Sequence, residues 1–153
     1  MTFTSTAKFT ETRHDNQRIQ VLVRRGRFKN QSNYPLRQDG RIHQYCPFHL
    51  VDEEIDRLLK LTETYLDQGV AQEVLAAWLH HRFVQIHPFH DGNGRVARSI
   101  ASLVLMEAGL LPFTVRLSDK RRYIEALKEA NRGDLAPFVN FIVKQQPCEG
   151  HPP

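Results

Sequence analysis

The chain has 153 residues, 41% of them hydrophobic and 25% charged, with a formal net charge of +4, a balance typical of one soluble globular domain. Its two cysteines, Cys46 and Cys148, form neither a disulfide framework nor a metal-ligand spacing. No window is apolar enough to span a membrane and residues 1–12 hold no signal-peptide core, so we expect a cytoplasmic protein.

Residues 1–50 differ from the rest of the chain in pattern and in charge. They hold 9 Lys and Arg against 3 Asp and Glu, whereas residues 51–153 hold 12 against 14. The run Ile19–Val23 is typical of a short strand. Asp39-Gly40, which stands between short alternating runs, is a hairpin signal. We therefore predict a β-rich segment over residues 1–50, with a hairpin at about 34–45.

From residue 51 onward, apolar residues recur with a helical period of about 3.6 residues. The first predicted helix begins near Val51 and stops at Gly69. The second must end before Pro88, because the residue before a proline is disfavoured in a helix. The apolar repeat that begins at Val96 marks the third helix, which ends near Gly109. Since the third helix is apolar on most sides, we expect it to be the most buried of the set.

Two shorter helices complete the prediction. They cover about residues 119–131, capped by Ser118, and about residues 135–145, capped by Asp134. Residues 51–145 would thus form a helical core, and the polar, Pro-rich tail 146–153 is expected to be disordered. The predicted fold class is mainly α, with a short β-rich N-terminal segment that includes the hairpin.

The segment His87–Arg98 gathers glycines and polar side chains between the second and third helices. Gly92 and Gly94 stand at the expected start of a helix, where main-chain N–H groups lack internal partners, and this arrangement suits a phosphate. Arg95 and Arg98 are three residues apart, so both guanidinium groups can reach the same anion.

Two further side chains add chemistry to this segment. Asp91 offers hard oxygen ligands where Mg²⁺ would bridge phosphates. His87 can serve as a general base at neutral pH. A base, a metal ligand, an anion-binding turn and two arginines are what phosphoryl and nucleotidyl transfer require. On composition alone, a plain helix–helix turn with polar caps is the alternative interpretation.

The segment also matches every fixed position of the Fic motif, H-x-F-x-D/E-G-N-G-R-x-x-R, and the chain resembles the Fic (Fido) family over about residues 19–145. The resemblance implies a Fic-type helical bundle over residues 51–145. It also implies a protein adenylyltransferase that transfers AMP from ATP to a Ser, Thr or Tyr hydroxyl of a target protein. ATP would be the substrate and Mg²⁺ the cofactor.

The resemblance also implies a role for each motif residue. His87 would deprotonate the target hydroxyl, Asp91 would bind Mg²⁺, and a buried Phe89 would anchor the loop. The phosphates would be held by the cradle of Gly92, Asn93 and Gly94 and by Arg95 and Arg98. Asn93 would reach the α-phosphate, Arg95 the β-phosphate and Arg98 the terminal phosphates.

Two later residues, Tyr123 and Asn131, match positions that line the adenine pocket in similar proteins. The alternatives are ordinary core packing for the tyrosine and a helix terminus for the asparagine. The 34–45 hairpin matches the Fic flap, which pairs with an extended stretch of the target. The resemblance thus makes four residues candidates for positioning the target, with plain hairpin packing as the alternative: Tyr34, Leu36, Ile42 and Tyr45.

Regulation and partners are less specified by the sequence. Many Fic proteins carry an inhibitory helix with the pattern S/T-x-x-x-E-G/N, which no stretch of this chain fits, because Pro147 interrupts the nearest candidate. We expect inhibition to come from a separate chain or from a segment outside this sequence, or to be absent. A homodimer stays open. The adjacent His80 and His81 point to different helix faces and make a poor metal pair.

Two alternative functions stay open at this point. A related Fic-fold transferase would move another phosphate-containing group, although the unaltered run Gly92–Arg95 favours a nucleotidyl product. A non-catalytic nucleotide-binding or DNA-associated regulator would use the basic first third of the chain. That third carries no known nucleic-acid motif, and a pure binder needs neither a base nor a metal ligand. We therefore expect a protein substrate as partner, and neither nucleic acid nor a membrane.

Overall fold

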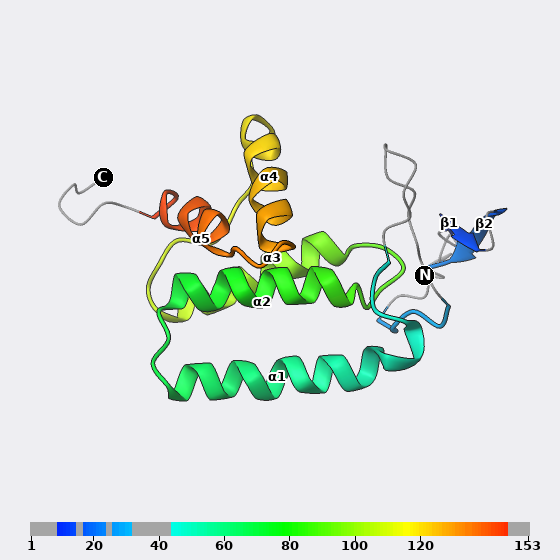
Figure 1. Ribbon diagram of the computed structural model, residues 1–153, viewed down its shortest axis with the longest axis horizontal. Helices are drawn as coiled ribbons and strands as arrows, with labels where there is room; N and C mark the ends of the chain where they lie inside the picture. Colours follow the sequence, from blue (N-terminus) through cyan, green and yellow to red (C-terminus); the bar gives the residue numbers. More distant parts are fainter. Residues whose placement is uncertain (1–8, 15–16, 24–25, 32–43, 147–153) are drawn as a thin grey trace, which may run out of the picture.

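Helices dominate the part of the chain that the structure describes (Figure 1). The computed structural model describes residues 9–14, 17–23, 26–31 and 44–146. Two 3-10 turns, Phe48–Leu50 and Leu117–Asp119, precede the first and fourth helices. The α-helices of this part are α1 (Val51–Asp67), α2 (Gln72–Ile86), α3 (Asn93–Glu107), α4 (Lys120–Ala130) and α5 (Ala136–Val143). The predicted mainly helical class is confirmed.

The helix ends follow local sequence signals in most places. Gly69 adopts a φ of 67° after α1, and its N–H donates to the Leu66 carbonyl at 3.0 Å. The Asp134 carboxylate accepts a hydrogen bond from the Ala136 N–H at 3.0 Å, where α5 begins. Ser118 lies inside the 3-10 turn Leu117–Asp119 and makes no cap. The extra turn moves the start of α4 past the serine, so the predicted cap is wrong.

The most buried helix is α2 and not α3, which corrects the prediction. α2 packs against α1, α3 and α5, so little of its surface is left to solvent. α3 keeps an outer side on which Leu103 and Met106 are 59% and 55% exposed. The many apolar residues of α3 therefore do not make it the most buried helix. The buried residues of α2 are Leu75, Ala76, Ala77, Leu79, His80, His81, Phe83 and Ile86.

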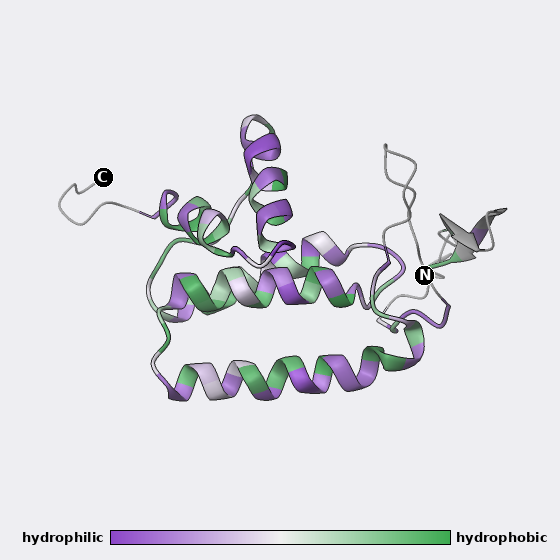
Figure 2. Ribbon diagram, in the orientation of Figure 1, coloured by the Kyte–Doolittle hydropathy of each residue, from purple (hydrophilic) through white to green (hydrophobic). Residues whose placement is uncertain are grey.

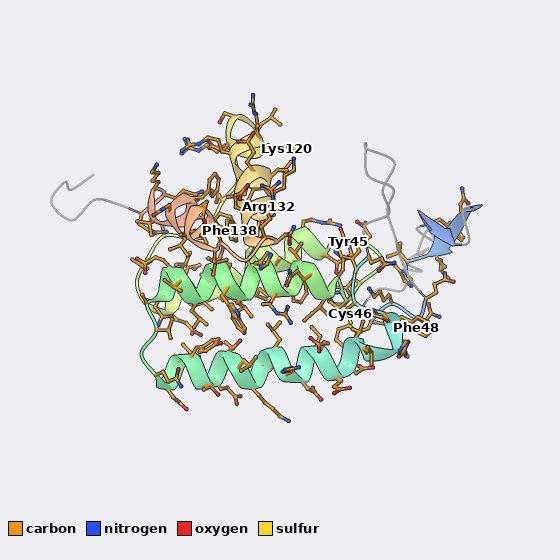
Figure 3. All side chains as sticks on the ribbon, viewed as in Figure 1. Tyr45, Cys46, Phe48, Lys120, Arg132 and Phe138 are labelled. Carbon is orange, nitrogen blue, oxygen red and sulfur yellow. The ribbon has the colours of Figure 1, made fainter. Side chains whose placement is uncertain are left out.

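The core continues from α2 to α5 through an aromatic cluster. Phe138 of α5 is fully buried and lies at the junction with α2 (Figure 3). Figure 2 shows α5 mostly in hydrophobic colours and α4 mostly in hydrophilic ones. α4 accordingly buries only Ala126 and Ala130 among its residues. Three rings contact His80 in this cluster, Phe113, Tyr123 and Phe138, and Phe141 packs in turn on Phe113 and Tyr123.

The N-terminal part holds an antiparallel pair, β1 (Phe9–His14) and β2 (Gln17–Leu22), in which Phe9 faces Leu22 and His14 faces Gln17. The sequence analysis did not predict β1. The flap hairpin expected at about 34–45 lies outside the described residues except for its last two positions. The flap, the β-rich character of residues 1–50 and the disordered tail therefore stay predictions. Within the described part, no helix combines the length and apolarity of a membrane span.

Candidate active site

His87 ends α2 with an unusual backbone. Its φ of 52° and ψ of 57° are left-handed, and no other non-glycine residue of the described part has a positive φ. The His87 N–H still donates to the Phe83 carbonyl at 2.9 Å, which closes the last turn of α2. A left-handed conformation in a non-glycine residue is strained, and such strain gathers at functional sites. The motif thus begins at a turn that is held by its surroundings.

The His87 ring is oriented from two sides. Its Nδ1 lies 3.2 Å from the Val84 carbonyl oxygen, and because a carbonyl only accepts, Nδ1–H is the donor. The ring also stacks on Tyr45, with centroids 3.7 Å apart and planes 11° from parallel. In the neutral ring the lone pair then resides on Nε2. This is the tautomer that a base acting through Nε2 requires.

The loop after His87 is held by Asn93, whose side chain is buried. Its Nδ2 donates to the Phe89 carbonyl at 2.7 Å, and its Oδ1 accepts from the Phe89 N–H at 2.9 Å. The half-buried Phe89 ring packs against Phe28 and Phe83, with centroids 5.5 and 6.2 Å away. The Asn93 amide therefore brackets the loop here, and its expected contact with the α-phosphate stays a prediction.

Asp91 lies just before the first turn of α3. Its Oδ1 accepts a hydrogen bond from the Gly92 N–H at 2.7 Å, and its Oδ2 lies 3.5 Å from Nη2 of Arg95. His90, beside it, is buried, and its Nε2 lies 3.2 Å from Oδ1 of Asn30. The described residues contain no group of three or more His, Cys, Asp or Glu side chains that could hold a metal ion. A metal at Asp91 would need ligands from a bound molecule.

Gly92 and Gly94 leave an open space beside the main chain, and the side chains of Arg95 and Arg98 lie at the edge of that space. A Cβ built on Gly92, whose φ is 86°, would lie 3.3 Å from Nη2 of Arg95. A Cβ built on Gly94 would lie 3.4 Å from Nη1 of Arg98. Both guanidinium groups therefore fold back over the start of α3. Asn93 and Gly94 are the first two residues of α3, where main-chain N–H groups have no partner within the helix, so donors and positive charge converge on one small space.

Arg98 is backed by Tyr123 and His80. The positive charge of Arg98 acts on Tyr123, whose hydroxyl lies 3.2 Å from Nε2 of His80. Burial raises the pKa of Tyr123, and the charge of Arg98 partly opposes that rise. Burial, reinforced by the positive charge of Arg98, lowers the pKa of His80 to about 3. His80 is therefore neutral, and its Nε2 shares a hydrogen bond with the Tyr123 hydroxyl.

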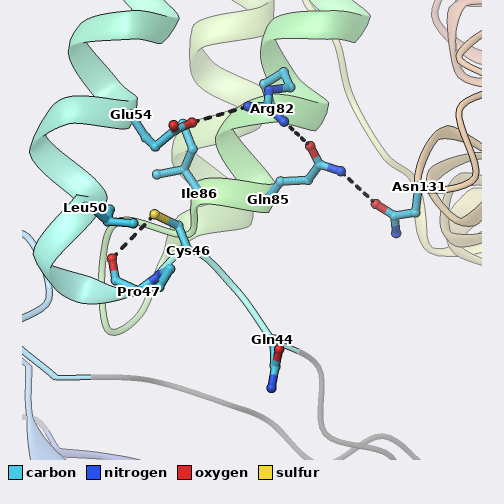
Figure 4. Close-up of a pocket in the computed structure, with 9 residues that line it drawn as sticks. All are labelled: Gln44, Cys46, Pro47, Leu50, Glu54, Arg82, Gln85, Ile86 and Asn131. Atoms are coloured by element: carbon cyan, nitrogen blue, oxygen red, sulfur yellow. Dashed lines mark hydrogen bonds and ion pairs between the residues drawn. The ribbon is translucent and has the colours of Figure 1, made fainter.

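A pocket of about 380 Å³ opens at the carboxyl end of α2, where Gln85 and Ile86 line it (Figure 4). Asn131 lines it, as the sequence predicts for the adenine pocket, whereas Tyr123 packs behind Arg98 and is not among the lining residues. The sequence analysis missed most of this lining, because its members are scattered over α1, α2 and the segment before α1. The lining residues are Gln44, Cys46, Pro47, Leu50, Glu54, Arg82, Gln85, Ile86 and Asn131.

The polar side of the pocket is one hydrogen-bonded chain. Arg82 donates to Oε2 of Glu54 at 3.3 Å and to Oε1 of Gln85 at 2.8 Å. Gln85 Nε2 then lies 3.4 Å from Oδ1 of Asn131, and His81 Nε2 lies 2.9 Å from the same oxygen. Because Oδ1 of Asn131 already faces two nitrogens, its amide NH₂ is the group left to meet an acceptor in the pocket.

Of the four predicted flap residues, Tyr34, Leu36 and Ile42 lie outside the described residues. Tyr45 stacks on His87 and lies beside the carboxyl end of α2 (Figure 3). Its predicted contact with a target protein stays a prediction.

Comparison with known proteins agrees with this geometry. Residues 8–105 match the Fic/DOC family, which is more than half of the chain. The chain belongs to the Fic/DOC family. The family resemblance predicted from His87–Arg98 is thereby confirmed, and the site at the start of α3 is the family's motif segment in this Fic/DOC chain.

Individual relatives cover different parts of this Fic/DOC chain. The protein adenylyltransferase Fic of Nematostella vectensis is 46% identical over 69 residues, which are 45% of this chain and 16% of that protein. A Fic domain containing signaling protein from Bacteroides thetaiotaomicron has a TM-score of 0.74 at 28% identity, over 78% of this chain and 50% of that one. The Fic-1 structure from C. elegans has a TM-score of 0.59 at 32% identity, over 63% and 29%.

Proposed function

We propose that this chain is a protein adenylyltransferase, which transfers AMP from Mg-ATP to a Ser, Thr or Tyr hydroxyl of a target protein. The observation that carries the proposal is the pairing of an oriented base, His87, with a donor-rich cradle at the start of α3 in one loop. The names of the curated relatives support it. The chain spans only 16% of the length of the first of these relatives, so the activity in their names is proposed for this chain.

The cradle suits the phosphates of a nucleotide. The N–H groups of Asn93 and Gly94 would donate to phosphate oxygens, as helix N-termini commonly do. Arg95 would hold the β-phosphate and Arg98 the terminal phosphate, since both guanidinium groups already border the space beside the glycines. The missing side chains at Gly92 and Gly94 let the phosphates approach the main chain.

Asp91 fits a role in binding Mg²⁺. Magnesium is commonly held by one or two carboxylates together with substrate phosphates, so a single carboxylate at the edge of the cradle is sufficient on the protein side. Asp91 would exchange its contact with Arg95, which spans 3.5 Å, for the metal. The bound ion would neutralise phosphate charge.

The transfer itself follows from these positions. The hydroxyl oxygen of the target attacks the α-phosphorus, and its proton passes to Nε2 of His87. The bond between the α-phosphorus and the α–β bridging oxygen breaks, and pyrophosphate leaves with that electron pair. Arg95 offsets the charge that develops on the leaving group. The Tyr45 stack and the Val84 carbonyl keep the histidine in the tautomer that accepts the proton.

The pocket beside Ile86 would hold the nucleotide base. Its position at the carboxyl end of α2, where Ile86 precedes His87, and its volume of about 380 Å³ suit a purine. Asn131 would offer its amide NH₂ to an acceptor nitrogen of the base, with its oxygen fixed by His81 and Gln85. The flap, including Tyr34, Leu36 and Ile42, would hold the target by main-chain pairing. A cytoplasmic location completes the proposal, with inhibition supplied by a separate chain, by a segment outside this sequence, or absent.

A double-label experiment tests this function. Two matched reactions of the chain with a lysate contain ATP labelled either at the α-phosphate or at the γ-phosphate, each with and without Mg²⁺. Transfer of AMP places the α-label on protein and leaves the γ-label in pyrophosphate. We expect α-label alone, and only with Mg²⁺. The His87→Ala variant serves as the control and should transfer no label while retaining its helical circular-dichroism spectrum.

Two outcomes contradict the proposal. Protein that carries the γ-label instead would make the reaction a phosphorylation. Full α-labelling by His87→Ala would remove the histidine from the mechanism.

A further inference from the structure

Lys29 is a buried lysine outside the motif. Its side chain is 3% exposed, although lysine is almost never buried in proteins unless a partner compensates the charge. It belongs to the basic N-terminal third, but its side chain is tucked against the end of α2. A buried charge at this place needs a structural reason.

The contacts of Lys29 bracket His87 on both sides. Its Nζ donates to the Ile86 carbonyl at 3.3 Å, and its main-chain N–H donates to the Pro88 carbonyl at 2.7 Å. These two carbonyls belong to the residues immediately before and after the histidine. Lys29 therefore fixes the main chain across the left-handed residue from a segment more than 50 positions away in sequence.

Lys29 also reaches the ring that orients the histidine. Its Nζ lies 5.9 Å from the centroid of the Tyr45 ring, within cation–π range. That ring stacks on His87 at 3.7 Å. Lys29 thus contacts both the main chain that carries His87 and the aromatic ring that lies against its imidazole. Figure 3 shows Tyr45 at this carboxyl end of α2.

Charge explains why a lysine suits this position. The carboxyl end of α2 carries the negative end of the helix dipole, which a cation stabilises. Burial lowers the pKa of Lys29 to about 8, and negative charge on the nearby Cys46 side chain would oppose that shift. The side chain therefore stays largely protonated at neutral pH, when all three ammonium hydrogens can donate.

We infer that Lys29 is a positioning residue for His87, which acts through the Ile86 and Pro88 carbonyls and the Tyr45 ring to hold the imidazole as a base. This inference rests on the proposed adenylyl transfer, in which His87 takes the hydroxyl proton. It extends the site beyond the motif, to a segment that the sequence analysis read only as a basic face.

Three variants test the inference. Lys29→Met keeps the length of the side chain and removes the ammonium group, and Lys29→Arg keeps the positive charge. Lys60→Met removes the same charge from an exposed position on α1 and is the matched control. For each variant we measure kcat and the KM for ATP in the transfer reaction, the thermal melt, and the ¹⁵N chemical shifts of the His87 ring, which report its tautomer.

If Lys29 positions His87, its replacement should lower kcat and leave the KM for ATP nearly unchanged. Lys29→Met should lower kcat by about 10- to 100-fold, as small displacements of a catalytic group do. The KM for ATP should change by less than about threefold, because the cradle is untouched. The His87 ¹⁵N shifts should move toward a tautomer mixture. Lys29→Arg should recover part of kcat, and Lys60→Met should behave as wild type.

The inference is overturned if folded Lys29→Met keeps the wild-type kcat and His87 shifts, or if kcat and KM worsen together with no change in those shifts. A wild type that transfers nothing from ATP overturns the proposed function instead, and the His87 shifts still decide the role of Lys29.

If Lys29→Met does not fold, the wild type supplies the test. Raising the pH through about 8 removes the Lys29 proton, so the His87 shifts should change in that range. The Cys46 thiol adjoins Lys29, and Glu54 and Arg82 influence that thiol, so the titration is repeated on Cys46→Ser. His87 shifts that stay constant through pH 8 in both proteins would contradict the inference.

Discussion

Gly94 and Asn93 show how the motif divides its work between neighbouring residues. The Asn93 amide is occupied by the main chain of Phe89, so this side chain shapes the loop. Gly94 contributes by lacking a side chain, which leaves space beside the guanidinium group of Arg98. A motif written as fixed letters hides this difference. Substitutions at the two positions should therefore fail for different reasons.

Replacing Gly94 with alanine separates binding from stability. The new Cβ would lie 3.4 Å from Nη1 of Arg98, in the space proposed for phosphate. We expect the affinity for ATP to fall by about tenfold, as measured by calorimetry. Because alanine is the better helix former by up to about 1 kcal/mol, the free energy of unfolding should stay level or rise.

A matched control for this prediction is Ser99→Ala, one turn further along α3. Ser99 is exposed, and its hydroxyl donates to the Arg95 carbonyl within the helix. This change also improves helix propensity but leaves the cradle alone, so ATP affinity should match wild type. Unchanged ATP affinity in Gly94→Ala would show that the phosphates do not lie against this turn.

At the scale of elements, α2 connects the two halves of the site. His80 and His81 project from it toward different neighbours, as the sequence predicts for adjacent helical residues. His80 hydrogen-bonds to the Tyr123 hydroxyl behind Arg98, and His81 hydrogen-bonds to Asn131 beside the pocket. Both histidines are buried, and burial lowers the pKa of each. The same helix ends in His87, so its packing positions the base, the arginine and the base pocket together.

The neutral His80 makes stability depend on pH. Its pKa is about 3 in the folded chain against 6.5 in the unfolded chain, so between these values the unfolded state binds more protons. The free energy of unfolding should therefore fall as the pH drops from 6.5 toward 3, by up to about 1.4 kcal/mol per pH unit from this residue. His80→Gln should flatten that slope in urea titrations, although His81 leaves part of it.

The comparison variant for this slope is His49→Gln, at the exposed turn before α1. It removes one imidazole from the surface and should leave the slope as in wild type. The quantity compared is the slope, because the absolute stability of His80→Gln also reflects lost packing against Phe113 and Phe138. An unaltered slope in His80→Gln would mean that His80 is protonated in the folded state.

At the scale of the whole molecule, the sequence predicted what depends on local spacing. The helix that stops before Pro88 and the turn at Gly69 are marked by residues at those positions. The motif residues from His87 to Arg98 form one loop and one helix start, so their proximity follows from sequence alone. Predictions failed where packing decides, as with α3, whose apolar surface stays partly exposed at Leu103 and Met106.

The rest of the site depends on contacts between distant segments. Lys29 reaches the end of α2 from the segment before α1, and nothing in the run around it distinguishes this lysine from its basic neighbours. Glu54 meets Arg82, and through it Gln85, only when α1 packs on α2. Gln85 lies only two residues before His87, so its closeness to the motif in sequence could have indicated that it belongs to the site.

The measurement that tests the central claim most directly is the mass added to a modified target peptide. The chain is incubated with Mg-ATP and a lysate, and modified peptides are sequenced by tandem mass spectrometry. Adenylyl transfer predicts a gain of about 329 Da on a Ser, Thr or Tyr side chain, which is AMP less water. A gain of about 80 Da would be a phosphate, and it would contradict the assignment of His87–Arg98 as a site for AMP transfer.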